Sequence, residues 1–449
     1  MKTYISIGFS LLFILSIIGC NDEAPTPEEQ EDLAKETLFE LMNTYYLWED
    51  EIPNGIDPDD YADVHELLDA MRYQPRDASL SYVEDLQEFR DRINSGSTGN
   101  VGFGVNLVAE YDETNPNLLE TIYIRESFSN ARDAGINRGD QLIGINQQLI
   151  KGLTTDQFNN LLAEVSEAGN AVFNLTTVDG IDQDIQVSTG EINIEAITLD
   201  RIIESNGKKV GYLALRSFLR EGLANDVRAI FQSFASQNID EIVLDFRYNG
   251  GGYVSVAQLM AEMIVPAEFY GKEFITFQHN DIISAEFDST LILTAPNSSR
   301  NYPELNLPRV FILTTGRTAS ASELVAVGLA PYIDVYLVGA QTFGKPVGSY
   351  TIEDEETNYM YSLISFQNVQ NELNIDYFDG LPVDFEAADG YQYPWGDPRD
   401  PMLGAALNFI DNGSFGVAAR KVSVIPSINF DEISSKEEAA YGAVVPLKK

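Results

Sequence analysis

The chain has 449 residues, 44% of them hydrophobic and 22% charged, which is the composition of a folded protein with roughly two to four domains. Its 28 basic and 70 acidic residues give a formal net charge of −42, which excludes nucleic acid as a main partner because phosphate contacts need clustered lysine and arginine. The same charge would repel an anionic membrane surface everywhere except at an anchor.

The first twenty residues have the pattern of a secretory signal. Lys2 is followed by an uncharged, mostly apolar run over residues 5–18 and by Gly19-Cys20. This ending resembles a bacterial lipobox, which implies that Cys20, the only cysteine and so unable to form an intrachain disulfide, carries the lipid. A membrane-spanning helix is the alternative, although the run is short for one. We therefore predict a signal peptide over 1–20, a lipid anchor at Cys20 in the periplasm or on the surface of a bacterial cell envelope, and a Pro- and Glu-rich tether over 21–32.

Residues 33–97 are expected to form an N-terminal helical segment. Leu38, Leu41 and Met42 lie on one helical face, and apolar residues repeat the pattern near residue 68. The aromatic cluster at 45–48 is expected to pack in a core rather than to bind a ligand. A turn-rich stretch at 95–100 marks the next boundary.

The second module is expected over residues 98–192. Alternating strands, a helix near 155–165, and the series Ala134-Gly135-Ile136, Gly139-Asp140 and Leu142 to Asn146 resemble a PDZ domain. The resemblance implies that a C-terminal peptide binds as an added strand, with its carboxylate held by backbone N–H groups. The implied carboxylate-binding loop consists of Gly102, Phe103, Gly104 and Val105; an ordinary turn is the alternative.

The third module, residues 193–411, is expected to be an α/β core. Apolar strands near 210–215, 239–245, 308–314 and 335–338 alternate with predicted helices over 223–237, 254–263 and 323–330. The tail over 412–449 is weakly patterned and is assigned no role.

Three polar stretches of this core each follow an apolar strand. They contain Gly250-Gly251-Gly252, Ser320 and Lys345. Ser320 opens a helix, where we expect the N–H groups of Ala321 and Ser322 to be free donors and the helix dipole to favour negative charge. Taken singly, the serine could be a helix cap, the lysine a solvated surface residue and the glycines a turn.

Together these stretches, from Asp245 to Gly252, Thr318 to Glu323 and Thr342 to Lys345, resemble the carboxyl-terminal processing peptidases, also called tail-specific proteases. The family implies a serine endopeptidase with a Ser–Lys dyad on a crotonase-like, Clp-protease-like α/β core, preceded or interrupted by the PDZ-like domain. On the matching positions, Ser320 is the nucleophile and Lys345 the base, while the oxyanion hole consists of Ala321 N–H with Gly251 or Gly252 N–H. Ser322 is the rival nucleophile.

A lysine must be neutral to act as a base, so burial has to lower its pKa by several units. We expect Phe343 to help exclude water from Lys345. Many family members carry a glutamine four residues after the lysine; here Ser349 takes that position and is a possible substitute that orients the amine. The two histidines, His65 and His279, do not lie in segments suited to catalysis.

The expected function is an exported, lipid-anchored endopeptidase whose partners are proteins or peptides bound through their C-terminal tails. No cofactor is expected, and no metal, because no cluster of metal-ligating residues is visible. The alternatives are a catalytically silent peptide- or ligand-binding lipoprotein on the same scaffold and a crotonase-type acyl-transfer enzyme.

Overall fold

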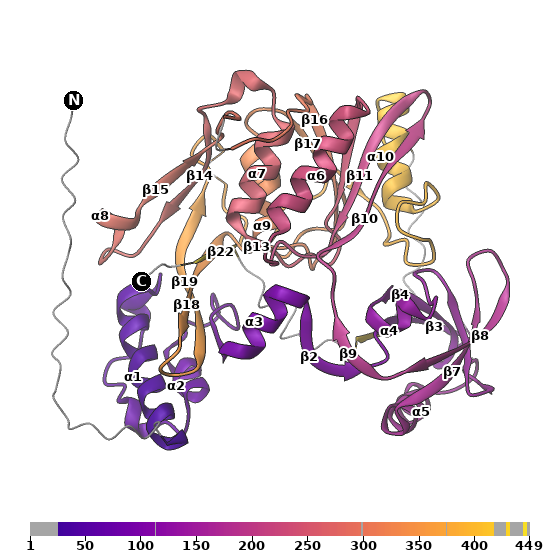
Figure 1. The fold of residues 1–449 in the computed structure, drawn as a ribbon, viewed down its shortest axis with the longest axis horizontal. Coiled ribbons are helices and arrows are strands. Elements are labelled where there is room, and N and C mark those ends of the chain that lie inside the picture. The colour runs from indigo at the N-terminus through magenta and orange to yellow at the C-terminus, as the bar shows by residue number, and fades with distance from the viewer. Residues whose placement is uncertain are drawn as a thin grey trace.

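A computed structural model describes residues 26–416, except 113, 298, 299 and 374, together with 428–431 and 443–446. The predicted signal peptide, Cys20 and the start of the predicted tether lie outside this range. The fold is mixed α/β, with a central core between an N-terminal helical part and a separate β-sheet part (Figure 1). No helix in the described part is long and apolar enough to cross a membrane.

The N-terminal part contains α1 (Pro27–Tyr45), α2 (Val64–Met71), β1 (Tyr82–Asp85) and α3 (Leu86–Ser95), with short 3-10 turns at Glu49–Glu51 and Pro58–Asp60. The predicted tether boundary is wrong, because residues 27–32 are already helical. Thr26 caps α1: its side-chain oxygen accepts from Glu29 N–H at 3.3 Å, and the Glu29 carboxylate accepts from Thr26 N–H at 2.9 Å. The prediction that the aromatic cluster packs in a core is confirmed at Tyr46, which is fully buried.

The sheet at the other end of the molecule has the strand order β21-β3-β4-β5-β7-β8 (Figure 1). Its strands are β3 (Val105–Asp112), β4 (Asn115–Ser127), β5 (Gln141–Ile145), β7 (Asn170–Thr176), β8 (Asp182–Ser188) and, from the tail, β21 (Ile428–Asp431), with β6 (Gln148–Leu149) paired to β5. Helices α4 (Ser129–Asp133) and α5 (Thr155–Ala168) accompany it. A hydrophobic core of its own includes Phe103, Phe158 and Phe173. The antiparallel pair β2 (Ser97–Gly102) and β9 (Gly190–Asn193) connects this part to the rest.

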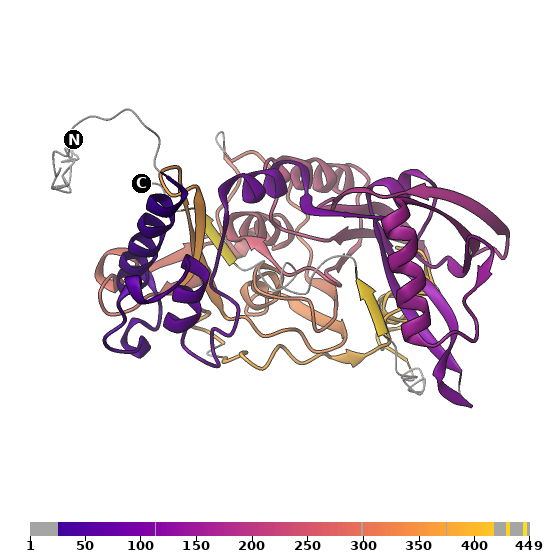
Figure 2. The same ribbon diagram turned by 90° about the horizontal axis from the view of Figure 1, so that it is seen from below.

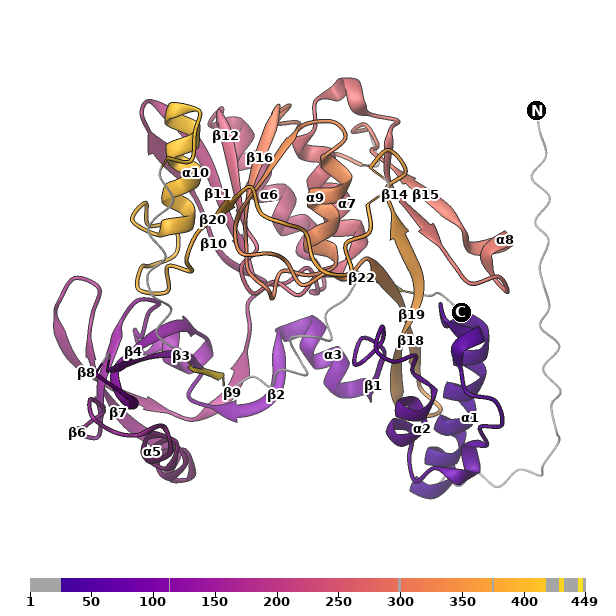
Figure 3. The same ribbon diagram turned by 180° about the vertical axis from the view of Figure 1, so that it is seen from behind.

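The central sheet has the order β10-β11-β12-β16-β17-β20, and all its neighbours are parallel except β10 and β11. The strands are β10 (Ile197–Ser205), β11 (Lys208–Leu215), β12 (Glu241–Asp245), β16 (Arg309–Thr314), β17 (Asp334–Gly339) and β20 (Phe385–Glu386). Helices α6 (Leu223–Ser236), α7 (Val254–Ile264) and α9 (Ala321–Leu329) contribute to one apolar core, and α10 (Pro401–Asn412) packs in a second core (Figure 3). The alternation of strands and helices predicted from the sequence is therefore confirmed.

A further sheet runs from the central core toward the N-terminal helices, in the order β13-β22-β18-β19-β14-β15 with β1 on β19. It contains β13 (Gly252–Tyr253), β14 (Glu273–Gln278), β15 (Ser289–Ile292), β18 (Val347–Asp354), β19 (Tyr359–Val369) and β22 (Ala443–Pro446); a short 3-10 turn at Ala267–Phe269 and α8 (Ser284–Phe287) lie between its early strands. The tail, whose weak sequence pattern predicts no role, thus supplies one strand to each of two sheets. Figure 2 shows these two strands as separate yellow arrows.

Candidate active site

The three polar stretches follow three neighbouring parallel strands. Asp245 of β12 pairs with Leu313 of β16, and Thr314 at the end of β16 pairs with Gly339 at the end of β17. Because the carboxyl ends of parallel strands meet at one edge of a sheet, the glycine run, Ser320 and Lys345 all leave the sheet at that edge.

A buried ion cluster fixes the start of the glycine-containing loop. Arg247 donates to the Asp245 carboxylate through Nε at 2.9 Å and through Nη2 at 2.6 Å. Its Nη1 donates to Asp400 at 2.6 Å. Arg247, Asp245 and Asp400 are at most 1% exposed. Buried charges of this kind are tolerated only when they are paired, so the cluster specifies one conformation for residues 245–247.

Asn249 joins the glycine loop to the start of α9. Its side-chain oxygen accepts from Gly251 N–H at 2.9 Å, and its backbone oxygen accepts from Ala319 N–H at 3.0 Å. A Cβ on Gly251 would lie 3.0 Å from Ala321 N and from Ser320 Cβ, so the loop is in direct contact with the serine. Of the two glycine donors predicted for the oxyanion hole, Gly251 N–H is already engaged with Asn249, whereas Gly252 pairs with Ala443 of the tail strand β22.

Ser320 is fully buried and has φ 56° and ψ −114°. Residues other than glycine rarely adopt this backbone conformation, which costs on the order of 1–3 kcal/mol and is found mainly at functional sites. Ser322 differs from it: its hydroxyl donates to Asn249 O and its N–H donates to Ala319 O, both at 3.1 Å. The prediction that Ser322 N–H is a free donor is therefore wrong, because the first turn of α9 tightens onto Ala319.

Glu323 connects the serine to the loop that carries the lysine. Its Oε2 accepts from Ser320 N–H at 2.7 Å and from Lys345 N–H at 2.9 Å. Its Oε1 accepts from Gly344 N–H at 2.9 Å and from the Thr342 hydroxyl at 2.5 Å. Burial raises the pKa of the Glu323 carboxyl, whereas these hydrogen bonds lower it. One carboxylate therefore fixes both backbone segments.

Lys345 is 1% exposed, and its Nζ has no hydrogen-bond partner among the described residues. Burial lowers the pKa of Lys345 to about 8, against the opposing effect of the carboxylates of Asp77 and Glu323. Asp77 comes from the N-terminal part and accepts from the Tyr46 hydroxyl at 2.8 Å and from Ser81 N–H at 2.7 Å.

Two expectations about the surroundings of Lys345 have different outcomes. The prediction that Phe343 shields the amine is wrong, because Phe343 is 45% exposed while the lysine beside it is buried. Ser349 is buried, but its hydroxyl and the lysine amine both lack hydrogen-bond partners in the described part, so no bond joins them here. No bond joins Lys345 Nζ to Ser320 Oγ either.

The buried histidine is engaged elsewhere. His279 contacts Asp288 through Nδ1 at 2.9 Å and the Tyr350 hydroxyl through Nε2 at 2.8 Å, and burial lowers its pKa. His65 packs edge-on against Tyr359. Over the described ranges, no group of three or more His, Cys, Asp or Glu residues is placed to hold a metal ion.

The predicted carboxylate-binding loop lies at the beginning of β3. Gly104 has φ 77°, and a Cβ there would lie 2.5 Å from Phe128 O, so glycine is required. Phe103 is buried against Phe173, with ring centroids 5.3 Å apart. The loop and Ser320 belong to different parts of the molecule, and the structure does not bring them together.

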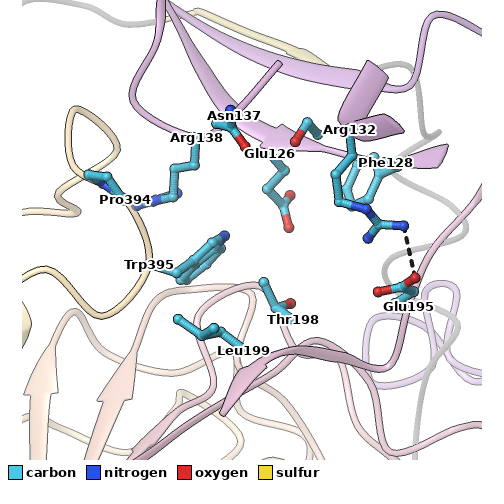
Figure 4. Close-up of a pocket in the computed structure, with 11 residues that line it drawn as sticks. Glu126, Phe128, Arg132, Asn137, Arg138, Glu195, Thr198, Leu199, Pro394 and Trp395 are labelled. Atoms are coloured by element: carbon cyan, nitrogen blue, oxygen red, sulfur yellow. Dashed lines mark hydrogen bonds and ion pairs between the residues drawn. The ribbon is translucent and has the colours of Figure 1, made fainter. Parts of the chain in front are cut away.

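A chain of buried polar contacts nevertheless links the two parts. Asn106 of β3 donates to Glu126 at 3.1 Å, and Glu126 accepts from Arg216 of the central core at 2.9 Å. Arg216 also donates to Tyr248 O, next to Asn249. Beside this chain of contacts lies a cavity of about 200 Å³, lined by Glu126, Arg138 and Trp395 and, at one side, by the Arg132–Glu195 ion pair (Figure 4).

The only sequence signal for the bridging role of Glu323 is its capping-box spacing to Ser320. The sequence does not indicate Asn249 or Asp77, because their roles depend on contacts between distant segments.

Comparison with known proteins finds matches over two stretches of the chain. Residues 209–365 match the model of peptidase family S41, and residues 34–82 match the peptidase S41 N-terminal domain. Relatives include a protein named "Probable CtpA-like serine protease" from Staphylococcus aureus (strain N315), 25% identical over 64% of this chain and 52% of its own length. Another is a carboxyl-terminal-processing protease from Picosynechococcus (strain PCC 7002), 28% identical over 56% of this chain and 55% of its own.

The chain thus spans about half the length of these curated relatives. Among solved structures, a protein described as "Putative S41 protease" from Bacteroides fragilis NCTC 9343 has the same fold, with a TM-score of 0.68 at 23% identity, over 84% of this chain and 97% of that one.

Proposed function

We propose that this chain, a serine peptidase of family S41, is exported and lipid-anchored and cleaves proteins that it recognises by their C-terminal tails. The proposal assigns the nucleophile to Ser320, the general base to Lys345, and the oxyanion hole to Ala321 N–H with Gly252 N–H. With the corrected boundary, residues 27–97 are proposed as the helical segment, 98–192 as the PDZ-like domain and 193–411 as the crotonase-like peptidase core. Cys20 is proposed as the site of lipidation.

One observation supports the dyad above the others: Glu323 Oε2 accepts from the backbone N–H groups of both Ser320 and Lys345, at 2.7 and 2.9 Å. Both backbones are thereby held around one atom, and the lysine amine beside them is buried with its pKa lowered to about 8. In the proposed active arrangement the lysine side chain turns so that Nζ reaches the serine hydroxyl. Hydrogen bonds between catalytic groups are often long or absent in a free enzyme and form when substrate binds.

In the proposed mechanism, neutral Lys345 removes the Ser320 proton as Oγ attacks the carbonyl carbon. The oxyanion that forms is stabilised by Ala321 N–H at the start of α9 and by Gly252 N–H, each worth about 3–4 kcal/mol in the transition state. The lysine ammonium then gives its proton to the leaving amine. Neutral Lys345 next activates a water that hydrolyses the acyl-enzyme and regenerates the serine.

The test uses purified protein without its lipid, and an unfolded substrate with an apolar C-terminus. We expect Ser320→Ala and Lys345→Ala each to abolish cleavage while circular dichroism shows a retained fold. The matched control is Ser322→Ala, which changes a neighbouring serine. Cleavage that persists in Ser320→Ala would overturn the proposal. Substrate blocked as a C-terminal amide should be cut more slowly if the loop at 102–105 binds a carboxylate.

Lipid anchoring requires its own experiment. Cells that express the full chain should incorporate labelled palmitate into it, and the Cys20→Ser variant should not. Equal labelling of the two proteins would exclude Cys20 as the lipidated residue.

A second candidate is a catalytically silent peptide-binding protein on the same scaffold. It is favoured by the complete burial of Ser320 and by the missing hydrogen bond between its hydroxyl and the lysine amine. Binding of apolar peptides without cleavage at any pH between 7 and 10 would support it.

A further inference from the structure

The tail strand β21 lies on β3, the strand that follows the proposed carboxylate loop. The pairing is antiparallel, with Ile428 opposite Ala109 and Asp431 opposite Asn106. On its other side β3 pairs with β4, so without β21 it would be an edge strand of this sheet. An exposed edge is where an extended peptide adds as a further strand, and β21 already occupies it.

The tail strand β22 occupies a second edge, at the candidate active site. It is parallel to β13 on one side, with Ala443 opposite Gly252, and parallel to β18 on the other, with Ala443 opposite Gly348. Gly252 is the proposed oxyanion donor, and β18 begins two residues after Lys345. The backbone of β22 therefore runs between β13 of the glycine loop and β18, the strand that follows Lys345 (Figure 1). An extended substrate that added a strand at this edge would need the same position.

We propose that the two tail strands, β21 (Ile428–Asp431) and β22 (Ala443–Pro446), act as intramolecular competitors that occupy both peptide-binding edges and exclude substrate from them. The inference rests on the proposed function, because only a tail-recognising peptidase would bind substrate at these two edges. The pairing of the strands is observed independently of that function. The sequence of β22 also indicates which peptides the catalytic edge would bind. They are extended segments of small and branched apolar residues, such as Ala443-Val444-Val445.

The order of the two strands separates a competitor from a substrate. A substrate bound by its C-terminus would place its last residues on β3 and earlier residues between β13 and β18. In the tail the order is reversed, because 428–431 lies on β3 and the later 443–446 lies at the catalytic edge. A chain with its strands in this order blocks both edges, but it does not bind in the orientation of a substrate held by its C-terminus.

Proline pairs provide the test. In an antiparallel pair, one of every two successive N–H groups points to the partner strand, so Asn429→Pro/Phe430→Pro removes a bond of β21 to β3. β22 lies between two strands, so each proline in Val444→Pro/Val445→Pro removes a ladder bond. The control is Glu437→Pro/Glu438→Pro, which makes the same change in the tail between β21 and β22 in the sequence.

All variants are made in full chains carrying Ser320→Ala, and the readout is binding of a fluorescein-labelled decapeptide that ends in Ala-Val-Val with a free carboxylate. A tethered competitor acts at an effective concentration of about 1 mM. A strand that binds its edge with a Kd of about 100 μM therefore weakens the apparent affinity for an external peptide about tenfold. We expect each strand variant to bind about tenfold more tightly than the control. Equal binding by all chains, or binding by none, would overturn the inference.

Hydrogen exchange gives a second readout that needs no peptide. Amides of β3 that face β21 should be protected in the control and lose protection in Asn429→Pro/Phe430→Pro. Unchanged protection would also overturn the inference. Because neither readout uses cleavage, failure of the competitor and failure of the proposed peptidase activity are distinguishable.

Discussion

Ser320 and Lys345 are held by the same carboxylate oxygen, since Oε2 of Glu323 accepts from the backbone N–H of each, at 2.7 and 2.9 Å. The two residues are 25 positions apart in the sequence and follow different strands of the central sheet. The bridge means that neither segment can move without disturbing the other.

Replacing Glu323 with Gln should therefore damage the site more than the fold. A glutamine offers one acceptor oxygen and turns the other into a donor that opposes the N–H groups of the lysine loop. We expect a loss of about 2 kcal/mol in the free energy of unfolding and a fall in kcat of at least about tenfold, because small displacements of catalytic groups are costly. Urea unfolding and steady-state kinetics measure both quantities.

The control for this change is Glu262→Gln. Glu262 is also fully buried and accepts from Thr294 N–H at 3.0 Å and from Arg300 at 2.8 Å, but it belongs to α7, outside the candidate site. It should lose stability with little change in kcat. A similar fall in kcat for both variants would contradict a positioning role for Glu323.

Gly251→Ala should reduce activity through the contact of the glycine loop with the serine. Gly251 has φ +111°, and the added methyl would lie 3.0 Å from Ser320 Cβ and from Ala321 N. The matched control is Gly207→Ala, where φ is +80° and nothing lies within 4 Å of the added atom. Both should lose about 1–2 kcal/mol of stability from the backbone conformation, and only Gly251→Ala should lower kcat, by about a hundredfold. Equal kcat in the two variants would argue against the contact.

Ser322→Ala distinguishes the two serines. The Ser322 hydroxyl donates to Asn249 O, so its removal should cost about 1 kcal/mol of stability and leave kcat within about twofold. Ser320→Ala should have the opposite profile. If Ser322→Ala lost activity and Ser320→Ala kept it, Ser322 rather than Ser320 would be the nucleophile.

Lys345 should destabilise the protein at neutral pH. Its pKa is about 8 in the folded state and 10.5 when unperturbed, so between these values the unfolded state binds more protons and stability rises with pH. At pH 7 the charged amine costs on the order of 3 kcal/mol. Lys345→Met should then unfold at higher urea at pH 7, and its advantage should shrink as the pH is raised from 8 to 10.5.

Lys35→Met is the control for that measurement. Lys35 pairs with Asp32 at 3.0 Å, an interaction that raises its pKa, so its replacement should not stabilise the protein. A gain in Lys35→Met equal to that in Lys345→Met would show that the added apolar side chain, rather than the relieved charge, is responsible.

The sequence predicted most of the central core because its strands and helices carry clear apolar patterns. The helix predicted over 223–237 is α6 (Leu223–Ser236), and the strand predicted over 308–314 is β16 (Arg309–Thr314). The start of α1 was missed because Thr26, Pro27 and Glu29 act as a helix cap while their composition is that of a tether. The strands β21 and β22 were missed because their pairing partners are more than 90 residues away and local pattern carries no such information.

Within the site, the positions of Ser320 and Lys345 relative to the strands followed from the sequence, whereas their surroundings did not. Phe343 was expected to shield the amine, but side-chain direction in a loop is set by tertiary contacts such as that of Phe343 N–H with Thr318 O at 2.9 Å. Asp77 approaches from the N-terminal part, so no local motif could indicate its influence on Lys345.

The most direct test of the account is the pH dependence of covalent labelling of the serine by a small fluorophosphonate, followed by intact mass and peptide mapping. We expect one adduct, on Ser320. Its rate of formation should rise through a single ionisation near pH 8, the pKa of Lys345, and become negligible in Lys345→Met. An adduct on another serine, or the same rate and pH profile in Lys345→Met, would contradict it.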